Sequence, residues 1–401
     1  MDGPWFSYLS LLLAKKASLD WIDLYLSERN NPSVKLLVQP GSGSTALVEA
    51  INRASKSIEI VIFRFDRREI EAALKAAAAR GVFVHALVTY RNRGGEKSLR
   101  KLEMRLLESG VTVARTADDL FRYHDKLMII DRQELYLLAF NFTALDIDHS
   151  RTFGLILEES ALVEEAVHLF EADCMRQPFS PREDALVVSP VNARKQLASF
   201  IDGTHEELLI YDPKISDPQM IRLLKQLSSE GKALRVIGRI GGKAGEVPVR
   251  KLGMRLHCRT MVRDQRDVFI GSQSLRKEEL DDRREVGVIV SDREIASVIR
   301  ATFEADWDAA QTDRSVSQVA KPRPASKAVK KAVKALVKQL PLSEVVKEAV
   351  QQVVESPANA LDADEVKDTV KEAVKEALKE GVKEAVKAAV DDEDDNSQSL
   401  E

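Results

Sequence analysis

Residues 123–131 read Tyr-His-Asp-Lys-Leu-Met-Ile-Ile-Asp, a His-x-Lys pair with four residues between the lysine and an aspartate. The run 127–130 is apolar, β-favouring and bounded by charge, so it predicts a buried strand. Alternate side chains of a strand share a face, so we expect His124 and Lys126 to point the same way. This pair suits a phosphate, because Lys126 neutralises phosphoryl oxygens while His124 attacks phosphorus or moves a proton.

A second copy of the pattern lies in the other half of the chain. His257 and Arg259 form the pair, with arginine for lysine, and four residues separate Arg259 from Asp264. Ten residues after each motif aspartate comes a small polar residue, Asn141 in the first copy and Ser274 in the second. One His-x-Lys pair is weak evidence, but chance rarely produces two aligned copies.

The doubled arrangement resembles the phospholipase D superfamily, whose mark is two His-x-Lys-x4-Asp motifs, each followed by Gly-Ser-x-Asn. The layout is most similar to the bacterial cardiolipin-synthase-like branch, over roughly residues 32–307. The resemblance implies an α/β fold of two similar lobes packed with pseudo-two-fold symmetry, which would bring both motifs to one centre. It implies no metal and no cofactor, because basic side chains compensate the phosphoryl charge.

By the same resemblance, one histidine attacks phosphorus and forms a phosphohistidine. The other protonates the leaving oxygen and then activates the water or alcohol that resolves the intermediate. The more complete first motif favours His124 as the nucleophile and His257 as the acid/base. Lys126 and Arg259 would compensate charge, although the planar fork of arginine differs from an ammonium in shape and reach.

The resemblance also assigns supporting positions. Asn141 and Ser272 are candidates for holding phosphoryl oxygens, and Ser274 stands where the family has its second asparagine. We expect the motif aspartates, Asp131 and Asp264, to stabilise the local fold.

Glu285 matches a family carboxylate that orients a histidine ring, whereas the partner position in the first half holds Thr152. An acid on the far ring nitrogen raises the basicity of the attacking nitrogen. Glu285 therefore favours His257 as the nucleophile, while the first motif and Asn141 favour His124, and both assignments stay open.

Strand and helix signals alternate from Val34, and the pattern repeats with an offset of 150, as Gly81 and Gly231 illustrate. Duplication of this kind predicts two lobes, which we place at 33–180 and 181–312.

The two ends differ from this body. We expect an N-terminal helical segment at 1–32, and a linker with a Lys/Ala/Val-rich, amphipathic helical or disordered tail at 313–401. Residues 5–26 predict a helix that caps the lobes or, alternatively, a peripheral membrane anchor. The basic stretch 327–340 is either a solvated helix or a second peripheral membrane contact.

Composition limits the partners. The net charge of −4 implies no global attraction to nucleic acid, which makes a nucleic-acid substrate the weaker alternative. Cys174 and Cys258 are the only cysteines, which favours a reducing, cytoplasmic location, with contact at the inner membrane face as an alternative. Because both half-sites are in one chain, we expect a monomer.

Three functions fit these observations. The first is a phosphodiesterase or phosphatidyltransferase acting on a phospholipid, and the second is a nuclease-type phosphodiesterase. The third is a catalytically impaired protein that binds phosphate esters or acts as a membrane scaffold, which the substitutions Arg259, Thr152 and Ser274 favour.

Overall fold

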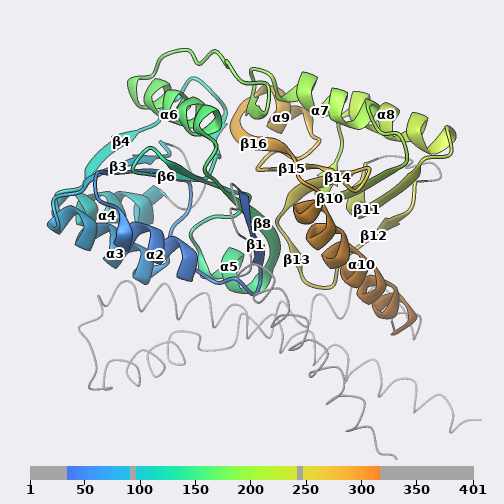
Figure 1. The fold of residues 1–401 in the computed structure, drawn as a ribbon, viewed down its shortest axis with the longest axis horizontal. Coiled ribbons are helices and arrows are strands. Elements are labelled where there is room, and N and C mark those ends of the chain that lie inside the picture. Colours follow the sequence, from blue (N-terminus) through green and yellow to red (C-terminus); the bar gives the residue numbers. More distant parts are fainter. Residues whose placement is uncertain (1–33, 91–95, 242–246, 317–401) are drawn as a thin grey trace, which may run out of the picture. The chain divides into compact units, whose positions relative to one another are not determined.

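The computed structural model describes residues 34–90, 96–241 and 247–316 (Figure 1). The N-terminal segment 1–32, the tail beyond 316 and the stretches 5–26 and 327–340 that were expected to contact a membrane lie outside the described residues. In the described part of the chain, no helix is both long enough and apolar enough to cross a bilayer.

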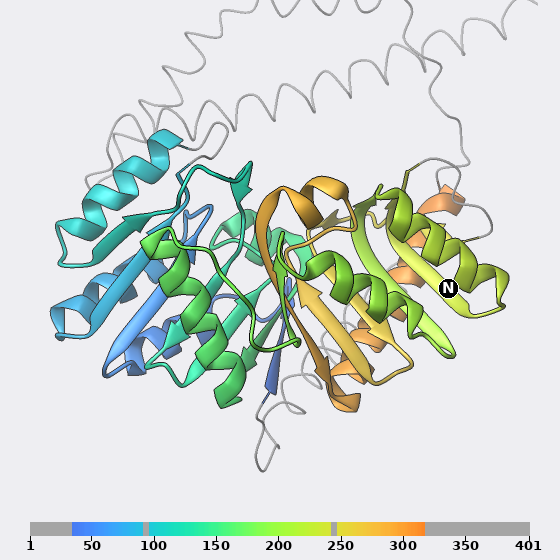
Figure 2. The same cartoon turned by 90° about the horizontal axis from the view of Figure 1, so that it is seen from above.

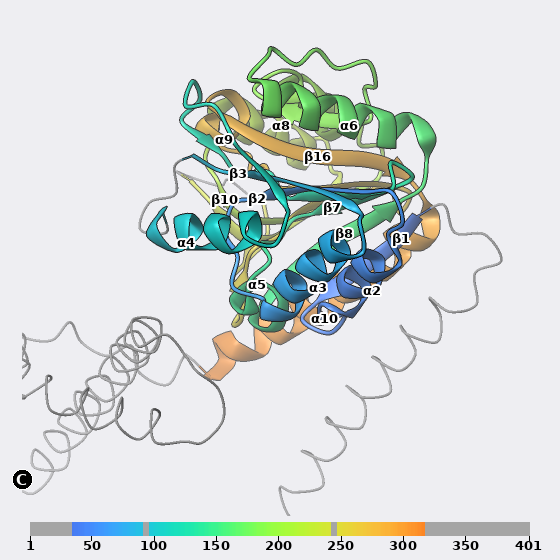
Figure 3. The ribbon, with the colours of Figure 1, turned by 90° about the vertical axis from the view of Figure 1, so that its left-hand side faces the viewer.

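Lobe 1 is built on a mixed sheet with the strand order β1-β8-β7-β6-β2-β3-β4. Its strands are β1 (Val34–Gln39), β2 (Ser57–Ile62), β3 (Phe83–Val88), β4 (Thr112–Arg115), β6 (Leu127–Ile130), β7 (Glu134–Leu138) and β8 (Ser150–Leu157). Its helices are α2 (Thr45–Arg53), α3 (Arg68–Ala79), α4 (Glu96–Leu107), α5 (Ala144–His149) and α6 (Ser160–Met175). Helix α6 covers one face of the sheet, and α2, α3 and α4 cover the other (Figures 1 and 3). The predicted strand 127–130 is confirmed as β6, which is wholly buried.

Lobe 2 repeats this plan with the strand order β12-β11-β10-β14-β15-β16, and β9 pairs with β16. Its strands are β9 (Leu186–Ser189), β10 (Glu207–Ile215), β11 (Ala233–Ile240), β12 (Val249–Arg250), β14 (Arg259–Arg263), β15 (Asp267–Gly271) and β16 (Arg283–Ser291). Its helices are α7 (Ala193–Asp202), α8 (Pro218–Ser229), α9 (Lys277–Asp281) and α10 (Arg293–Val316). The equivalent strand orders confirm the prediction of two similar α/β lobes, which lie side by side in Figure 2.

The offset between the lobes changes along the chain. It is 150 in the first strands, where Ser57 pairs with Phe83 as Glu207 pairs with Ala233, and 133 between the motif histidines. Lobe 1 carries α4 and β4 before its motif, whereas the corresponding described part of lobe 2 has only β12. The shorter connection between β11 and β13 in lobe 2 accounts for the smaller offset between the motif histidines.

Each lobe contributes a two-residue strand to the sheet of the other. Strand β5 (Arg122–Tyr123) pairs with β16 of lobe 2, and β13 (Arg255–Leu256) pairs with β8 of lobe 1. This reciprocal exchange follows the pseudo-two-fold relation. It places the residue after each short strand, which is a motif histidine, against the opposite lobe.

Two buried ion pairs obey the same relation. Arg284 of lobe 2 lies 2.9 Å from Asp173 of lobe 1, and Arg151 of lobe 1 lies 2.6 Å from Asp306 of lobe 2. Each pair is offset from the other by 133 residues, and the surrounding apolar core contains buried residues of both lobes. The lobe interface therefore combines a shared core with reciprocal ion pairs.

Removing one member of such a pair should destabilise the chain more than removing both. We expect Asp173→Leu to lower the free energy of unfolding by about 3–5 kcal/mol, because it leaves the Arg284 guanidinium buried without its carboxylate. The double variant Asp173→Leu/Arg284→Met should recover a large part of that loss in urea unfolding.

The control is Glu158→Gln, which breaks the exposed pair of Glu158 with Lys35 and should change the free energy by less than about 0.5 kcal/mol. A double variant no more stable than Asp173→Leu would contradict the role given to the pair.

Candidate active site

The structure brings both motifs together at the lobe junction. His124 and His257 follow β5 and β13, and they expose only 6% and 9% of their surface. The expectation that His124 lies on the motif strand was wrong, because residues 124–126 form the link between β5 and β6. The backbone N–H of His124 donates to the carbonyl of Arg284 at 2.8 Å, and that of His257 to the carbonyl of Arg151 at 3.1 Å.

His124 has a carboxylate from the opposite lobe. Its Nδ1 lies 2.8 and 3.1 Å from the two oxygens of Glu285, which is fully buried. This corrects the expectation that Glu285 supports His257: the carboxylate reaches across the junction because β5 lies beside β16. An Nδ1–H that donates to Glu285 leaves the Nε2 lone pair available for attack.

His257 has a different carboxylate, which the sequence analysis missed. Its Nδ1 lies 3.5 Å from Asp146 Oδ2, an electrostatic contact rather than a hydrogen bond. Thr152, at the position equivalent to Glu285, is buried, and its hydroxyl has no partner in the described part of the chain. Thr152 has no carboxylate to offer His257, and Asp146 provides the carboxylate beside that ring instead.

A local signal could have identified Asp146. Asp146 lies five residues after Asn141 and accepts its backbone N–H at 2.8 Å. Glu279 lies five residues after Ser274 and accepts its backbone N–H at the same distance. The two acids are equivalent under the pseudo-two-fold relation, but Glu279 faces Arg259 at 3.7 Å, whereas Asp146 faces a histidine.

The two basic motif residues are held in similar ways. Lys126 is fully buried and its ammonium donates to the carbonyl of His124. Arg259 donates from Nη1 to the carbonyl of His257 at 3.0 Å and from Nε to Ser274 Oγ at 3.2 Å. Arg259 therefore uses its N–H groups on two acceptors of its own lobe, the carbonyl of His257 and the hydroxyl of Ser274.

The expected phosphoryl-binding residues lie in the same buried region but have protein partners. Asn141 donates from Nδ2 to Asp146 Oδ2 at 2.6 Å, and Ser272 exchanges hydrogen bonds with the backbone of Val286 at 3.1 and 3.3 Å. Ser274 accepts from Arg259. These side chains therefore fix the positions of other site residues in the structure.

Asp131 and Asp264 lie at the far ends of the motif strands. Asp131 accepts hydrogen bonds from the backbone N–H groups of residues 55–57, and Asp264 accepts those of residues 205–207. Both aspartates have positive φ, 52° and 49°, in the turns that join β6 to β7 and β14 to β15. They anchor each motif hairpin to its own lobe.

Burial dominates the electrostatics of the site. It holds the pKa values of His124 and His257 well below 6.5, and the nearby charges of Lys126 and Arg259 act in the same direction. Burial lowers the pKa of Lys126 to about 7, although Glu285 opposes the shift. Burial and the charge of Glu279 raise the pKa of Glu285 to about 8.

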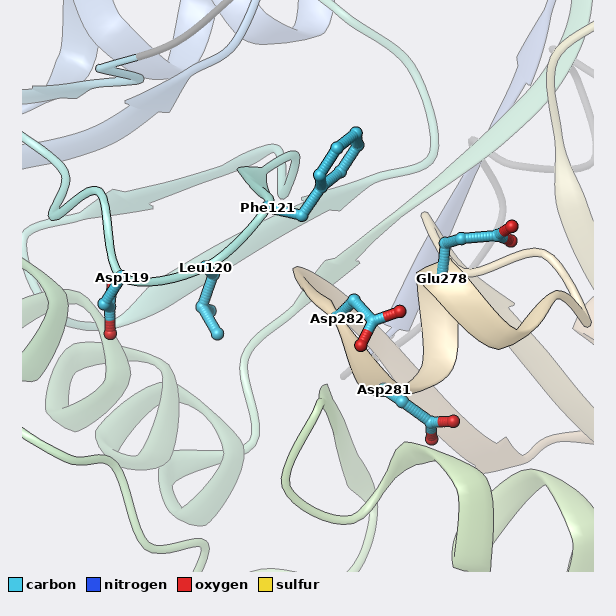
Figure 4. Close-up of a pocket in the computed structure, with 6 residues that line it drawn as sticks. All are labelled: Asp119, Leu120, Phe121, Glu278, Asp281 and Asp282. Atoms are coloured by element: carbon cyan, nitrogen blue, oxygen red, sulfur yellow. The ribbon is translucent and has the colours of Figure 1, made fainter.

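A cavity of about 350 Å³ lies beside β5, between the segment 119–121 of lobe 1 and the α9 region of lobe 2 (Figure 4). Carboxylates dominate its lining, which comprises Asp119, Leu120, Phe121, Glu278, Asp281 and Asp282. Across the described ranges, no group of three histidine, cysteine or acidic residues is arranged to hold a metal ion.

Comparison with known proteins identifies the family of this site. The family model described as "Cardiolipin synthase, PLD-like domain" matches residues 47–174 and 238–307, which include both motifs. The chain belongs to the phospholipase D superfamily. Members of this superfamily are phosphoryl-transfer enzymes, and both motifs of this chain lie within the matched residues.

Relatives with other names share this phospholipase D-like region. A polyphosphate kinase of Pseudomonas syringae pv. tomato is 24% identical over 303 residues, which cover 67% of this chain and 41% of that protein. The matched part of this chain therefore spans well under half the length of that curated relative.

Two solved structures show the same fold. The polyphosphate kinase of Porphyromonas gingivalis has a TM-score of 0.58 and 20% identity, with coverage of 68% of this chain and 46% of that chain. The phosphatidylserine synthase of Haemophilus influenzae Rd KW20 has a TM-score of 0.53 and 12% identity, with coverage of 73% and 90%. At these identities the comparison supports the two-sheet α/β phospholipase D-like fold alone.

The depressed histidine pKa values predict a specific pH dependence of stability. A histidine in the unfolded chain takes up a proton near pH 6.5, whereas buried His124 and His257 stay neutral to lower pH. At these two positions the unfolded state then binds more protons, so the two histidines contribute a free energy of unfolding that falls as pH decreases from 6.5 toward 5. Glu285, whose pKa is raised to about 8, contributes in the opposite direction, so the histidine contribution is read from variants rather than from wild type alone. In urea unfolding across this range, the free energy of unfolding should increase less with rising pH in His124→Gln and in His257→Gln than in wild type.

The exposed His205 provides the control, and His205→Gln should keep the wild-type slope. An unchanged slope in both site variants would mean that neither buried imidazole is kept neutral by its surroundings.

Proposed function

We propose that the chain is a phosphodiester hydrolase or transferase that acts on a phospholipid through a phosphohistidine intermediate. The observation that carries the proposal is the pair of buried histidines from two lobes, with a carboxylate of the opposite lobe beside His124. The cardiolipin-synthase description of the matching family model supports a phospholipid as the substrate.

The contacts support His124 as the nucleophile. Glu285 fixes the ring through Nδ1, so Nε2 attacks phosphorus and forms a P–N bond while the P–O bond to the leaving group breaks. His257 gives its proton to the leaving oxygen, then removes one from the water or alcohol that attacks phosphorus and breaks the P–N bond.

The site supplies a reason for His257 to be protonated when substrate is bound. In the structure the pKa of His257 is low because burial and Arg259 disfavour the charged ring. A bound phosphodiester brings a negative charge between the basic groups, which raises the pKa of His257, and Asp146 stabilises the imidazolium. Lys126 is protonated more fully for the same reason and neutralises phosphoryl oxygens.

A second candidate is phosphoryl transfer to or from polyphosphate. The polyphosphate kinase of Pseudomonas syringae supports it, because its match to this chain covers 303 residues. The same histidine chemistry serves a phosphoanhydride, since the leaving group is then a phosphate oxygen.

The function is tested by measuring product release from phospholipid vesicles, polyphosphate with a nucleoside diphosphate, and single-stranded DNA. We expect head-group release from vesicles, with a loss of at least about 100-fold in His124→Ala and His257→Ala, because general acid–base catalysis alone contributes about 10²–10⁴-fold. His205→Ala, at an exposed histidine, should keep the wild-type rate.

Activity on polyphosphate alone would support the second candidate, and cleavage of DNA alone would support a nuclease. If wild type is inert on all three substrates, the chain is a binding or scaffold protein.

Trapping the intermediate assigns the two histidines. The substrate is a ³²P-labelled 4-nitrophenyl phosphodiester, whose leaving group departs without a general acid, and the reaction is stopped with alkali. His257→Ala should then retain label on the protein, because resolution needs the missing base. His124→Ala should retain none. Label in His124→Ala with none in His257→Ala would reverse the assignment.

A further inference from the structure

A second cavity, of about 320 Å³, lies in lobe 2 against the segment that leads to β13. Its lining includes Pro213 and Gly238 from the ends of β10 and β11, and Arg239, Lys251 and Arg255. None of the described residues that line it is acidic. The cavity therefore differs in charge from the carboxylate-lined cavity beside β5 (Figure 4).

Two of its three basic side chains are available to a ligand. Arg239 and Lys251 are exposed, and neither makes a hydrogen bond or ion pair within the described part of the chain. Arg255 is engaged, because its Nη1 donates to Asp146 Oδ1 at 2.5 Å and to Ser150 Oγ at 2.6 Å. Cations without protein partners in a concave site favour an anion.

The cavity is connected to the reacting groups through Arg255. This residue lies two positions before His257, and it contacts Asp146, whose other oxygen faces the His257 ring. The positive charge of Arg255 also acts on His257. An anion in the cavity would therefore lie on the His257 side of the centre.

Lobe 1 has larger side chains at two of the equivalent positions. The strand registers pair Ile62 with Val88 and Asp212 with Gly238, so Val88 and Phe63 are the equivalents of Gly238 and Pro213. The Phe63 ring packs edge-on against His124, with a centroid distance of 4.4 Å.

The glycine itself is required by the backbone of lobe 2. Gly238 has φ +145°, and a Cβ there would lie 1.7 Å from the carbonyl oxygen of Asp212. Gly238 therefore leaves this part of the cavity wall without a side chain.

We infer that this cavity binds a phosphate of the substrate other than the one attacked by histidine, through Arg239 and Lys251. The substrate class is then a phosphate ester or anhydride that carries a second phosphate, either a polyphosphate chain or a phosphorylated lipid head group. The inference rests on the proposed phosphoryl-transfer function and narrows its substrate.

The test uses the full chain and the variant Arg239→Gln/Lys251→Gln. Calorimetry should show that wild type binds tripolyphosphate at least about tenfold more tightly than orthophosphate, and that the variant loses this preference, because each charge-assisted hydrogen bond contributes about tenfold or more. Turnover of bis(4-nitrophenyl) phosphate, which has one phosphate, should stay within about twofold of wild type. The control Arg222→Gln/Lys225→Gln removes two exposed cations of α8 and should keep the preference.

A second measurement separates the two possible sources of the second phosphate, a lipid head group and a polyphosphate chain. It compares binding to vesicles that contain a lipid with a phosphorylated head group and to vesicles of the same lipid without that phosphate. A preference for the phosphorylated lipid that the variant loses identifies the head group, and a preference confined to tripolyphosphate identifies the chain. If the variant retains every preference of wild type, the inference is overturned even when the ester is turned over. If no ester is turned over, the proposed function fails, and calorimetry still shows whether Arg239 and Lys251 bind a phosphate in the cavity.

Discussion

The site depends on the exchange of short strands between the two lobes. The segment that carries each motif histidine is bonded to the last strand of the opposite sheet, at His124 with Arg284 and at His257 with Arg151. Neither lobe alone holds its histidine in place, because the backbone partner belongs to the other. The reciprocal ion pairs and the shared apolar core maintain this exchange, and they link stability to the geometry of the site.

The same burial places several titratable groups where their charged forms are disfavoured. Lys126, Arg259 and two imidazoles lie together with Glu285 in a region with little access to water. Without an added anion, burial disfavours their charged forms, which is why the pKa of Lys126 is near 7 and that of Glu285 near 8. On the proposed function, a bound phosphodiester or phosphoanhydride would supply the negative charge that favours the protonated forms of Lys126 and His257.

Sequence reasoning identified the parts of the site that depend on repetition. The two motifs, their aspartates and the two-lobed α/β fold could be predicted because strand periodicity and equal spacing are local signals. The histidine that Glu285 contacts could not be predicted. Because β5 and β13 are exchanged between the lobes, Glu285 lies beside His124 of the opposite lobe rather than beside His257 of its own lobe. Asp146 was missed because the expected partner position held Thr152. Its spacing from Asn141, which matches that of Glu279 from Ser274, is a local signal for the acid, but only the fold shows that Asp146 faces His257.

The departures of the second motif produce an asymmetric centre. Arg259 donates to Ser274 and lies 3.7 Å from Glu279. Asp146, the equivalent of Glu279, instead lies 3.5 Å from Nδ1 of His257. One histidine is thus fixed by a hydrogen-bonded carboxylate, and the other has a looser carboxylate and an adjacent basic cavity. A nucleophile benefits from a fixed ring and a free lone pair, while an acid/base must change its charge during the reaction. On the proposed assignment, the looser contact between His257 and Asp146 suits a group that changes its charge during the reaction.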